Sequence, residues 1–298
     1  MKFGSIEAGG TKFVCAVGNE NYEILDSVRI PTTTPDETLS KCIEYFEKFD
    51  DLTAMSIASF GPIEVRTDSP KYGYITDTPK PNWSNTNFLG TMKKHFDIPI
   101  FWTTDVNGSA YGEYITSIRN HNPLQTLVYY TFGTGVGAGI INEGSFIGSL
   151  GHPEAGHIYL KRHPDDLDFK GLCPYHHSCL EGLAAGPTFD VRCGKKGKDV
   201  SMDDPVWDIM AYYIAQAVMQ ATLFIRPQKV ILGGGVISEP VIKKVREQFK
   251  EMFNDYVEVG DLDYYITMPA CEDNGSATIG NFALASRQYY KENIVKID

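Results

Sequence analysis

The spacing of apolar residues along the chain predicts two helices. The first follows Thr34-Pro35-Asp36-Glu37, a run that supplies an N-cap, a proline at the first helical position and a glutamate three residues after the cap; apolar side chains then recur at helical spacing. The second begins near Asp204, presents a broad apolar face and ends at Arg226-Pro227. Its most apolar part, residues 209–225, is short for a membrane span of roughly 20 residues, so we expect a buried core helix.

Two segments repeat one pattern of strands and turns. Residues 7–24 and 130–147 align without a gap, so that Gly10-Thr11 matches Gly133-Thr134 and a later Asn-Glu pair matches another. Each copy predicts a strand, a Gly-Thr turn, a strand, an Asn-Glu turn and a strand, because glycine and asparagine supply the backbone conformations of tight turns. The alternative is an accidental likeness between two β-meanders.

The sequence after each meander favours a true duplication. Helical sequence follows, and later an apolar strand that ends in glycine, LTAMSIASFG in the first half and KVILGGG in the second. The segment at residues 119–126 is polar, contains proline and precedes the second meander. We therefore expect an N-terminal α/β lobe at residues 1–120 and a C-terminal α/β lobe at residues 121–298, with the C-terminal helix able to return to the first lobe.

Composition narrows the class of protein. The 298 residues are 42% hydrophobic and 22% charged, which suits a packed globular chain. The net charge of −11 comes without any basic run, which argues against a nucleic-acid or membrane partner. The N-terminus shows no secretory signal, so we expect a cytoplasmic protein whose six cysteines are core residues or metal ligands and not disulfides.

The glycine-rich turns are candidate phosphate sites. A Gly-Thr turn between strands offers backbone N–H groups and a hydroxyl to phosphate oxygens, and two related turns could hold one polyphosphate. The sequence contains no Walker loop, and GTGVGAG does not fit the dinucleotide-binding pattern. Plain hairpin turns are the alternative. A third cluster follows the strand KVIL and would let a base or ribose approach the backbone, unless it is a simple strand-to-helix turn.

Asp105 is the candidate catalytic base. It comes directly after an apolar strand, at the start of a predicted helix. One hypothesis is that its carboxylate takes the proton of a hydroxyl that attacks the terminal phosphate of a nucleotide. The alternative is an N-cap, since aspartate is favoured where a chain enters a helix. Asn107 could hydrogen-bond the acceptor.

Five motifs in this order resemble the ROK family of sugar kinases, specifically its zinc-containing bacterial fructokinase branch: IEAGGTK, TTDVNGSAYGE, TFGTGVGAGII, GHPEAGH…CPYHHSCLEG and VILGGGV. The resemblance covers almost the whole chain. It implies a two-lobed actin-like ATPase fold, with ribonuclease-H-like duplicated α/β domains, a cleft between the lobes and a zinc-bound loop. It also implies ATP, Mg²⁺, a hexose acceptor and a homodimer.

The resemblance assigns roles at matching positions. Asp105 is similar to the family's catalytic base. The nucleotide-side positions are a first phosphate loop, a second one, an adenosine-side loop and a proline that could simply open a helix: Gly9, Gly10, Thr11 and Lys12; Gly133 and Thr134; Gly233, Gly234 and Gly235; and Pro187. Many family members have aspartate where this chain has Glu7, so a contribution of Glu7 to Mg²⁺ binding stays open.

Residues 151–182 hold five of the seven histidines and two of the six cysteines. Structural zinc takes four nitrogen or sulfur ligands in a tetrahedron. The best set is His157, Cys173, His176 and Cys179, spaced H-x₁₅-C-x₂-H-x₂-C, where the common family motif has a third cysteine in place of one histidine. His177 could replace His176. His152 and His163 are expected to be solvated or locally hydrogen-bonded.

Two carboxylates flank the cluster of proposed zinc ligands. The resemblance makes Glu154 and Glu181 acceptors of hydrogen bonds from sugar hydroxyls, and a zinc ion beside them would hold both at a defined separation. As ordinary surface residues they would need no such role. Residues 72–83 are expected to line the other wall of the sugar cleft, with Asn82 as a contact.

These expectations combine into one functional hypothesis. We expect ATP-dependent phosphorylation of a hexose, first of all D-fructose to fructose 6-phosphate, with lobe closure around the sugar. Mannose, glucose or an N-acetylhexosamine are alternative acceptors. A sugar-sensing protein of the same fold without turnover is an alternative of another class. Family regulators carry an additional N-terminal helix-turn-helix, and this chain starts with its first strand, which disfavours a repressor.

Overall fold

The computed structural model describes residues 1–271 and 275–294 of the chain. Internal contacts group the chain into two compact units. The first unit contains Met1–Pro123, Gly148–His152 and the chain from Ala270 on, and the second unit contains Leu124–Ile147 and Pro153–Pro269. The expected lobes at residues 1–120 and 121–298 stay a prediction.

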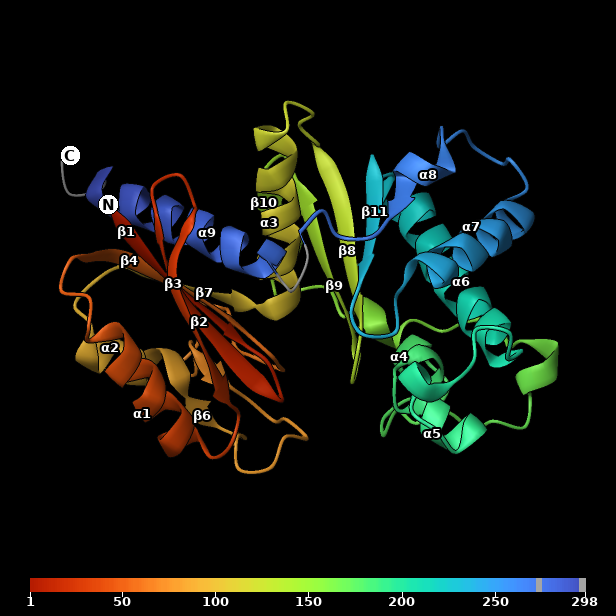
Figure 1. Cartoon of the computed structure of the whole chain (residues 1–298), viewed down its shortest axis with the longest axis horizontal. Helices are drawn as coiled ribbons and strands as arrows, with labels where there is room; N and C mark the ends of the chain where they lie inside the picture. Colours follow the sequence, from red (N-terminus) through yellow and green to blue (C-terminus); the bar gives the residue numbers. More distant parts are fainter. Residues whose placement is uncertain (272–274, 295–298) are drawn as a thin grey trace. The chain divides into compact units, whose positions relative to one another are not determined.

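The first unit is built on a five-stranded sheet in the order β3-β2-β1-β4-β7 (Figure 1). Its first three strands form an antiparallel meander, and β4 and β7 continue from β1 in parallel. The strands are β1 (Lys2–Ala8), β2 (Lys12–Asn19), β3 (Ile24–Pro31), β4 (Leu52–Ser59) and β7 (Ile100–Thr104).

Helices cover both faces of this sheet. The alternation of side chains along β1 explains why, since Ile6 packs in the cluster under α1 (Pro35–Phe46) and α2 (Phe88–His95), and Phe3 packs against Phe282 of α9 (Gly275–Ile294). The predicted N-cap of α1 is confirmed: Thr34 Oγ1 accepts a hydrogen bond from the N–H of Glu37. Two short strands, β5 (Tyr74–Ile75) and β6 (Thr86–Asn87), pair apart from the main sheet.

Helix α3 (Asp105–Arg119) crosses α9 at a point where both helices have glycine. A Cβ on Gly112 would lie 1.7 Å from the carbonyl oxygen of Ser276, and one on Gly280 would lie 2.0 Å from that of Gly108. The two backbones therefore touch at these glycines. This close crossing fixes α3, the helix that begins with Asp105.

The second unit repeats the sheet of the first, in the order β10-β9-β8-β11-β12. Strand directions are repeated as well: an antiparallel meander is followed by two parallel strands. These strands are β8 (Thr126–Phe132), β9 (Val136–Asn142), β10 (Ser145–Phe146), β11 (Lys229–Gly233) and β12 (Ile266–Thr267). The predicted α/β class with two sheets of related design is confirmed.

The second Gly-Thr turn differs from the first in length. Ala8 pairs with Phe13 across the first turn, whereas Phe132 pairs with Val136 across the second. The second turn is one residue shorter, which the gapless alignment of the two segments did not predict. The two strand pairs are therefore joined by turns of different length, although the sequences around the turns are similar.

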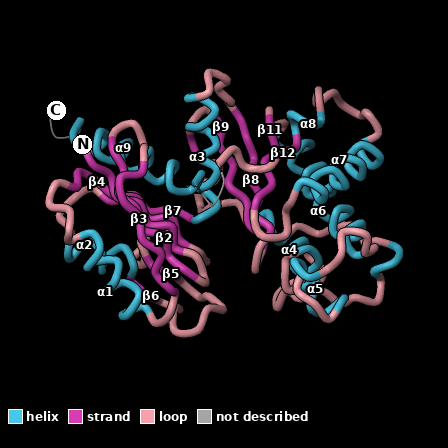
Figure 2. Tube along the Cα trace, in the orientation of Figure 1, coloured by secondary structure: helices cyan, strands magenta, loops and turns pink. Residues whose placement is uncertain are grey.

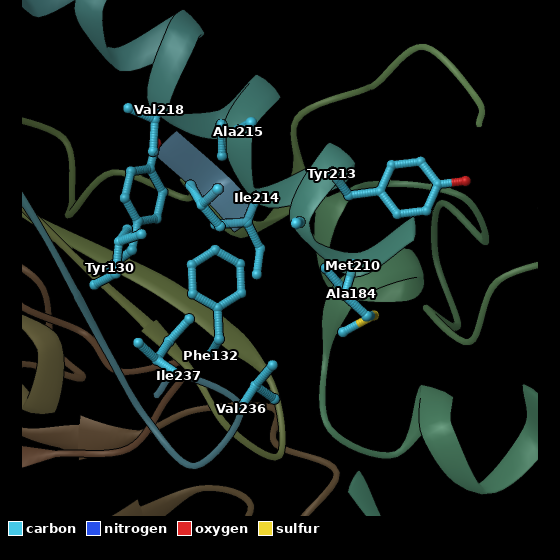
Figure 3. Close-up of a cluster of buried hydrophobic side chains, with 14 of the residues drawn as sticks. Tyr130, Phe132, Ala184, Met210, Tyr213, Ile214, Ala215, Val218, Val236 and Ile237 are labelled. Atoms are coloured by element: carbon cyan, nitrogen blue, oxygen red, sulfur yellow. The ribbon is translucent and has the colours of Figure 1, made fainter. Parts of the chain in front are cut away.

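The helices of the second unit pack mainly around α6 (Val206–Ile225), which starts and ends within two residues of its prediction and is largely buried. Figure 3 shows Ile214 and Val218 of α6 beside Tyr130 and Phe132 of β8. The remaining helices of this unit are α4 (Leu180–Ala184), α5 (Thr188–Cys193), α7 (Glu239–Phe253) and α8 (Leu262–Tyr265) (Figure 2). Three short 3-10 turns are η1 (Ala155–His157), η2 (Pro164–Asp166) and η3 (Gly197–Asp199). Among the described residues, none of the helices combines the length and apolar character needed to cross a membrane.

Candidate active site and metal centre

The first Gly-Thr turn joins β1 to β2. The N–H of Gly9 donates to the carbonyl of Lys12 at 3.0 Å, and Thr32 binds the turn through its own N–H, which donates to Thr11 O, and its hydroxyl, which donates to Gly9 O. Gly10 is exposed, and a Cβ there would meet no atom within 4 Å. The hydrogen bonds from Thr32 therefore hold the backbone of the turn, and the space next to Gly10 is open. An anion-binding turn requires both features.

Asp105 is the first residue of α3. Thr104 precedes it as the N-cap and accepts from the N–H of Asn107 at 3.2 Å. The alternative that Asp105 caps the helix is therefore wrong: the preceding threonine already fills that place, and Asp105 Oδ1 accepts from the N–H of Val106 at 2.9 Å.

Asp105 and the first turn lie at the same edge of the first sheet. In the parallel pairs, Ala8 lies opposite Ser59 and Ser59 opposite Thr104, so all three end their strands in one row. Since neighbouring strands are about 4.8 Å apart, the strand ends that lead into the turn and into Asp105 are separated by about 10 Å. The first turn and Asp105 are therefore neighbours at one edge of the first sheet.

Burial raises the pKa of Asp105 to about 6, while the Val106 N–H and the interaction with His152 partly oppose that rise. A carboxyl group with this pKa is roughly nine-tenths ionised at pH 7 and is a stronger base than an ordinary aspartate. Both properties suit a group that must take up a proton near neutral pH.

Asn107 is buried in the same first turn of α3. Its Nδ2 donates to Thr103 Oγ1 at 3.1 Å, while its buried Oδ1 has no hydrogen-bond partner among the described residues. A buried oxygen of this kind is costly unless something donates to it. The structure thus places the predicted substrate contact Asn107 close to Asp105 in sequence and in space.

Asn82 lies elsewhere in the first unit. It is exposed, has left-handed backbone geometry (φ 70°) and lines a groove of about 670 Å³ between α1 and α2. These helices cover one face of the sheet, whereas α3 covers the other. The structure does not bring Asn82 together with Asp105, and its role as a sugar contact stays a prediction. Glu7, on β1 beside the turn, likewise keeps its open assignment to Mg²⁺.

The second Gly-Thr turn joins β8 to β9 and has close neighbours. The N–H of Gly186 donates to Gly133 O at 2.7 Å, and the N–H of Val136 donates to Glu181 Oε2 at 3.0 Å. A Cβ on Gly135 would lie 2.6 Å from that carboxylate oxygen, whereas one on Gly133 would meet nothing within 4 Å. This turn is therefore open at Gly133 and occupied by a carboxylate at Gly135.

The other predicted nucleotide positions meet this second turn. The N–H of Val236 donates to Phe132 O, and a Cβ on Gly234 would lie 2.4 Å from the same oxygen, so Gly234 is required for packing. Gly233 is equally crowded, by Tyr129, but Gly235 faces open space. Pro187 follows Gly186 and is the residue before α5. The structure thus gathers Gly133, Thr134, Pro187 and the glycine cluster at one end of the second sheet.

Four donors form a compact cluster in the second unit: His157, Cys173, His176 and Cys179, whose ligand atoms all lie within 4.8 Å of one another. His157 Nδ1 is 3.5 Å from Cys179 Sγ and 3.7 Å from Cys173 Sγ, and His176 Nδ1 is 3.8 Å from Cys173 Sγ. Zinc bonds of about 2.3 Å to sulfur and about 2.05 Å to nitrogen give a tetrahedral edge of about 3.6 Å. The donor set fits zinc with all four positions filled by protein.

Backbone pairing explains how these distant residues meet. Cys173 and His177 exchange two backbone hydrogen bonds and close a tight turn that carries His176. A second bridge joins Tyr159 to Cys179 and places His157 beside the turn. His177, with left-handed geometry (φ 53°), lies outside the cluster and serves through its backbone. Burial of the thiol raises the pKa of Cys179 to about 11, so the thiolate needs a cation to form at neutral pH.

The two carboxylates that flank the cluster differ in their settings. Glu181 is the second residue of α4, two positions after Cys179, and its carboxylate binds the second turn. Glu154 is exposed and precedes η1, the turn that ends at His157. Both are thus joined by a few residues to a cluster member, as expected.

Some features of the site were not predicted. His152 interacts electrostatically with Asp105 and belongs to the first unit, whereas His163 is locally hydrogen-bonded as expected, accepting from the N–H of Asp165. The brace from Gly186 and the contact at Gly135 were also missed. The glycines at positions 135 and 186 were a sequence signal for close backbone contacts. Only the fold shows which atoms these glycines contact.

Comparisons with known proteins agree with this architecture. A fructokinase from Streptococcus mutans is 54% identical over 289 residues, which cover 96% of this chain and 97% of the relative. A fructokinase from Lactococcus lactis subsp. cremoris is 49% identical over 292 residues, covering 97% of this chain and 99% of the relative. A ROK hexokinase from Thermus thermophilus has a TM-score of 0.78 at 19% identity, covering 98% of this chain and all of that chain, so the predicted actin-like α/β fold is confirmed. Residues 3–288 match the family model described as the ROK family, and the chain belongs to this family.

Proposed function

We propose that this chain is an ATP-dependent fructokinase that converts D-fructose to fructose 6-phosphate. The observation that carries the proposal is the identity of about half of all residues, over nearly the whole length, with relatives that are named fructokinases. The alignments cover 96–97% of this chain and 97–99% of these relatives, which supports the same reaction for the whole chain.

Asp105 acts as the general base. Its Oδ1 already accepts from the N–H of Val106, so we assign Oδ2 as the oxygen that takes the proton of the sugar hydroxyl. As that hydroxyl oxygen bonds to the γ-phosphorus of ATP, the bond from this phosphorus to the bridging oxygen breaks and ADP leaves. Asn107 Oδ1 accepts a hydrogen bond from the substrate and so orients the hydroxyl. Phosphoryl transfer depends mostly on positioning and on neutralising charge, so one well-placed carboxylate is sufficient.

The two Gly-Thr turns bind the phosphates of ATP through backbone N–H groups. The open space above Gly10 and Gly133 supports this role, and Thr11, Thr134 and Lys12 add side-chain donors. Gly235 and Pro187 flank the nucleoside end. A Mg²⁺ ion bound with the nucleotide would neutralise the charge on the transferred phosphoryl group.

The Cys/His cluster holds a structural zinc. Its ligands are His157, Cys173, His176 and Cys179, and the ion would link the two limbs of one long loop. Glu154 and Glu181, each close to a ligand in sequence, accept hydrogen bonds from fructose hydroxyls. We further propose that the enzyme is a cytoplasmic homodimer, and light scattering on the purified protein tests the dimer.

A panel of hexoses with coupled ADP detection tests the proposal. We expect the highest kcat/KM for fructose, with mannose, glucose and N-acetylhexosamines at least about tenfold lower. Faster turnover of another hexose would reassign the substrate within the same reaction. If no hexose yields ADP while fructose still raises Tm, the protein is a sugar sensor and the proposed reaction is wrong.

A further inference from the structure

Arg192 of α5 forms a buried ion pair with Asp166, which lies in the loop that carries the metal cluster. Its Nε donates to Asp166 Oδ1 at 2.9 Å and its Nη2 to Asp166 Oδ2 at 2.8 Å, while the guanidinium lies 3.9 Å from the centre of the Phe169 ring. The two charged side chains are only 7% and 5% exposed. A two-pronged pair at this burial is strongly oriented, because only arginine offers the matching fork of donors.

The remaining guanidinium nitrogen of Arg192, Nη1, contacts α4. Nη1 donates to the carbonyl of Leu183 at 2.8 Å, in the last turn of that helix, where carbonyls lack partners within the helix. Helix α4 has five residues, too few to be stable alone. It begins directly after the cluster member Cys179, so one end is fixed by the metal cluster and the other by Arg192.

Asp166 lies midway along the loop between His157 and Cys173. The hydroxyl of Tyr213 donates to its Oδ2 at 2.8 Å, and Figure 3 shows the Tyr213 ring pointing away from the hydrophobic side chains on the same helix. Arg162 donates to the backbone carbonyl of Asp166. The middle of the loop is thus fastened to α5 and α6 independently of the cluster that joins its ends.

We infer that Arg192 is a positioning residue that holds Glu181 in place through α4. Glu181 is the second residue of this helix, and its carboxylate reaches the N–H of Val136 in the second Gly-Thr turn. The inner side chains of α4 are buried in the core, namely Leu180, Leu183 and Ala184. The two fastened ends set the direction in which Glu181 projects. The inference rests on the proposed function to the extent that Glu181 is assigned to fructose.

The variant Arg192→Lys tests this, since lysine keeps the charge and cannot make the fork. We expect KM for fructose to rise about tenfold, the factor that accompanies loss of one hydrogen bond to a charged group, with kcat and KM for ATP within about twofold. A chelator should withdraw zinc about tenfold faster. Hydrogen exchange should accelerate at the amides of Leu183 and Ala185, which donate within α4.

Arg246→Lys is the matched control. Arg246 pairs with Asp263 at 2.7 Å and donates to Ile266 O in the same unit, but these contacts join α7 to α8 and β12 and do not involve α4. We expect this variant to change Tm alone. If Arg192→Lys folds poorly, Asp166→Asn weakens the same pair with less change in shape and should give the same pattern.

Two outcomes would overturn the inference. One is a lower Tm for Arg192→Lys with unchanged KM for fructose and unchanged α4 exchange, which would leave a purely structural pair. The other is equal changes in both arginine variants. If the wild-type protein fails to phosphorylate fructose, the proposed function falls, and zinc release and hydrogen exchange still decide whether Arg192 holds α4.

Discussion

The two Gly-Thr turns occupy equivalent places in two sheets of the same strand order, yet their surroundings differ. The first turn is braced from its own meander, by Thr32, and stays open above Gly10. The second is one residue shorter and is contacted by three later segments, through Glu181, Gly186 and Gly234. The duplicated sheets supply the same backbone frame, and the later segments of the second unit make the difference.

The difference separates two tasks. Beside the first turn, at the same sheet edge, stands Asp105 with its raised pKa. Beside the second stands Glu181, two residues after the cluster member Cys179. We therefore expect damage near the first turn to affect phosphate binding and the chemical step, and damage to the position of Glu181 beside the second turn to affect sugar recognition. Variants on each side can test this separation.

Asp105→Asn should have the largest effect. It removes the base without changing side-chain size, and kcat should fall by roughly 10²–10⁴-fold with ATP still bound. The free energy of unfolding should not fall. The pKa of the Asp105 carboxyl is ordinary in the unfolded chain and about 6 in the folded protein, so its negative charge at pH 7 disfavours folding, and asparagine removes that charge. Steady-state kinetics and thermal unfolding measure both.

Asp36→Asn is the control for Asp105→Asn, since Asp36 is an exposed aspartate in the first turn of another helix. It should leave kcat unchanged. Near-normal turnover of Asp105→Asn would remove Asp105 as the base and with it the chemical role of the first sheet edge.

Cys179→Ser should have the next largest effect. Loss of one of four ligands should release zinc, and a cost of a few kcal/mol corresponds to a fall in Tm of about 10 °C for a chain of this size. KM for fructose should rise more than KM for ATP because α4 starts at the next residue. Cys193→Ser, a cysteine outside the cluster, should change neither zinc content nor KM. Full zinc occupancy in Cys179→Ser would contradict the ligand set.

A pair of glycine variants compares the turns directly. Gly135→Ala places a Cβ 2.6 Å from Glu181 Oε2 and displaces the carboxylate from the N–H of Val136, so KM for fructose should rise about tenfold. Gly10→Ala meets no protein atom and projects into the proposed phosphate space, so KM for ATP should rise instead. Kinetics with each substrate varied in turn measure the contrast. Equal effects on both constants would show that the turns are not specialised.

The sequence predicted the secondary-structure elements better than the contacts between distant segments. The capping residues of α1, the apolar face of α6 and the repeated meander are local patterns, and the structure contains all three. The approach of His157 to Cys179 depends on pairing between segments about 20 residues apart, for which motif spacing gave only an indirect signal.

Local sequence patterns did not predict several details that depend on the folded backbone. The capping role given to Asp105 as an alternative belongs to Thr104, because threonine and aspartate are both good caps and only the backbone shows where the helix starts. The Arg192–Asp166 pair joins residues 26 positions apart and has no motif at all. The shorter second turn likewise depends on the register of a ladder, which a gapless alignment does not contain.

The pH dependence of the reaction gives the smallest effect and the most specific one. Since the base must be ionised, kcat/KM should lose half its plateau value near pH 6 and about tenfold for each further unit of acidification, whereas an ordinary aspartate would hold its activity down to about pH 4. The residual activity of Asp105→Asn should lack this limb. If the variant retains a limb near pH 6, the titrating group belongs to the nucleotide or to another residue, and burial of Asp105 has no part in the chemistry of the first sheet edge. If the limb disappears, Asp105 is the titrating group, and the chemical step belongs to the edge of the first sheet as proposed.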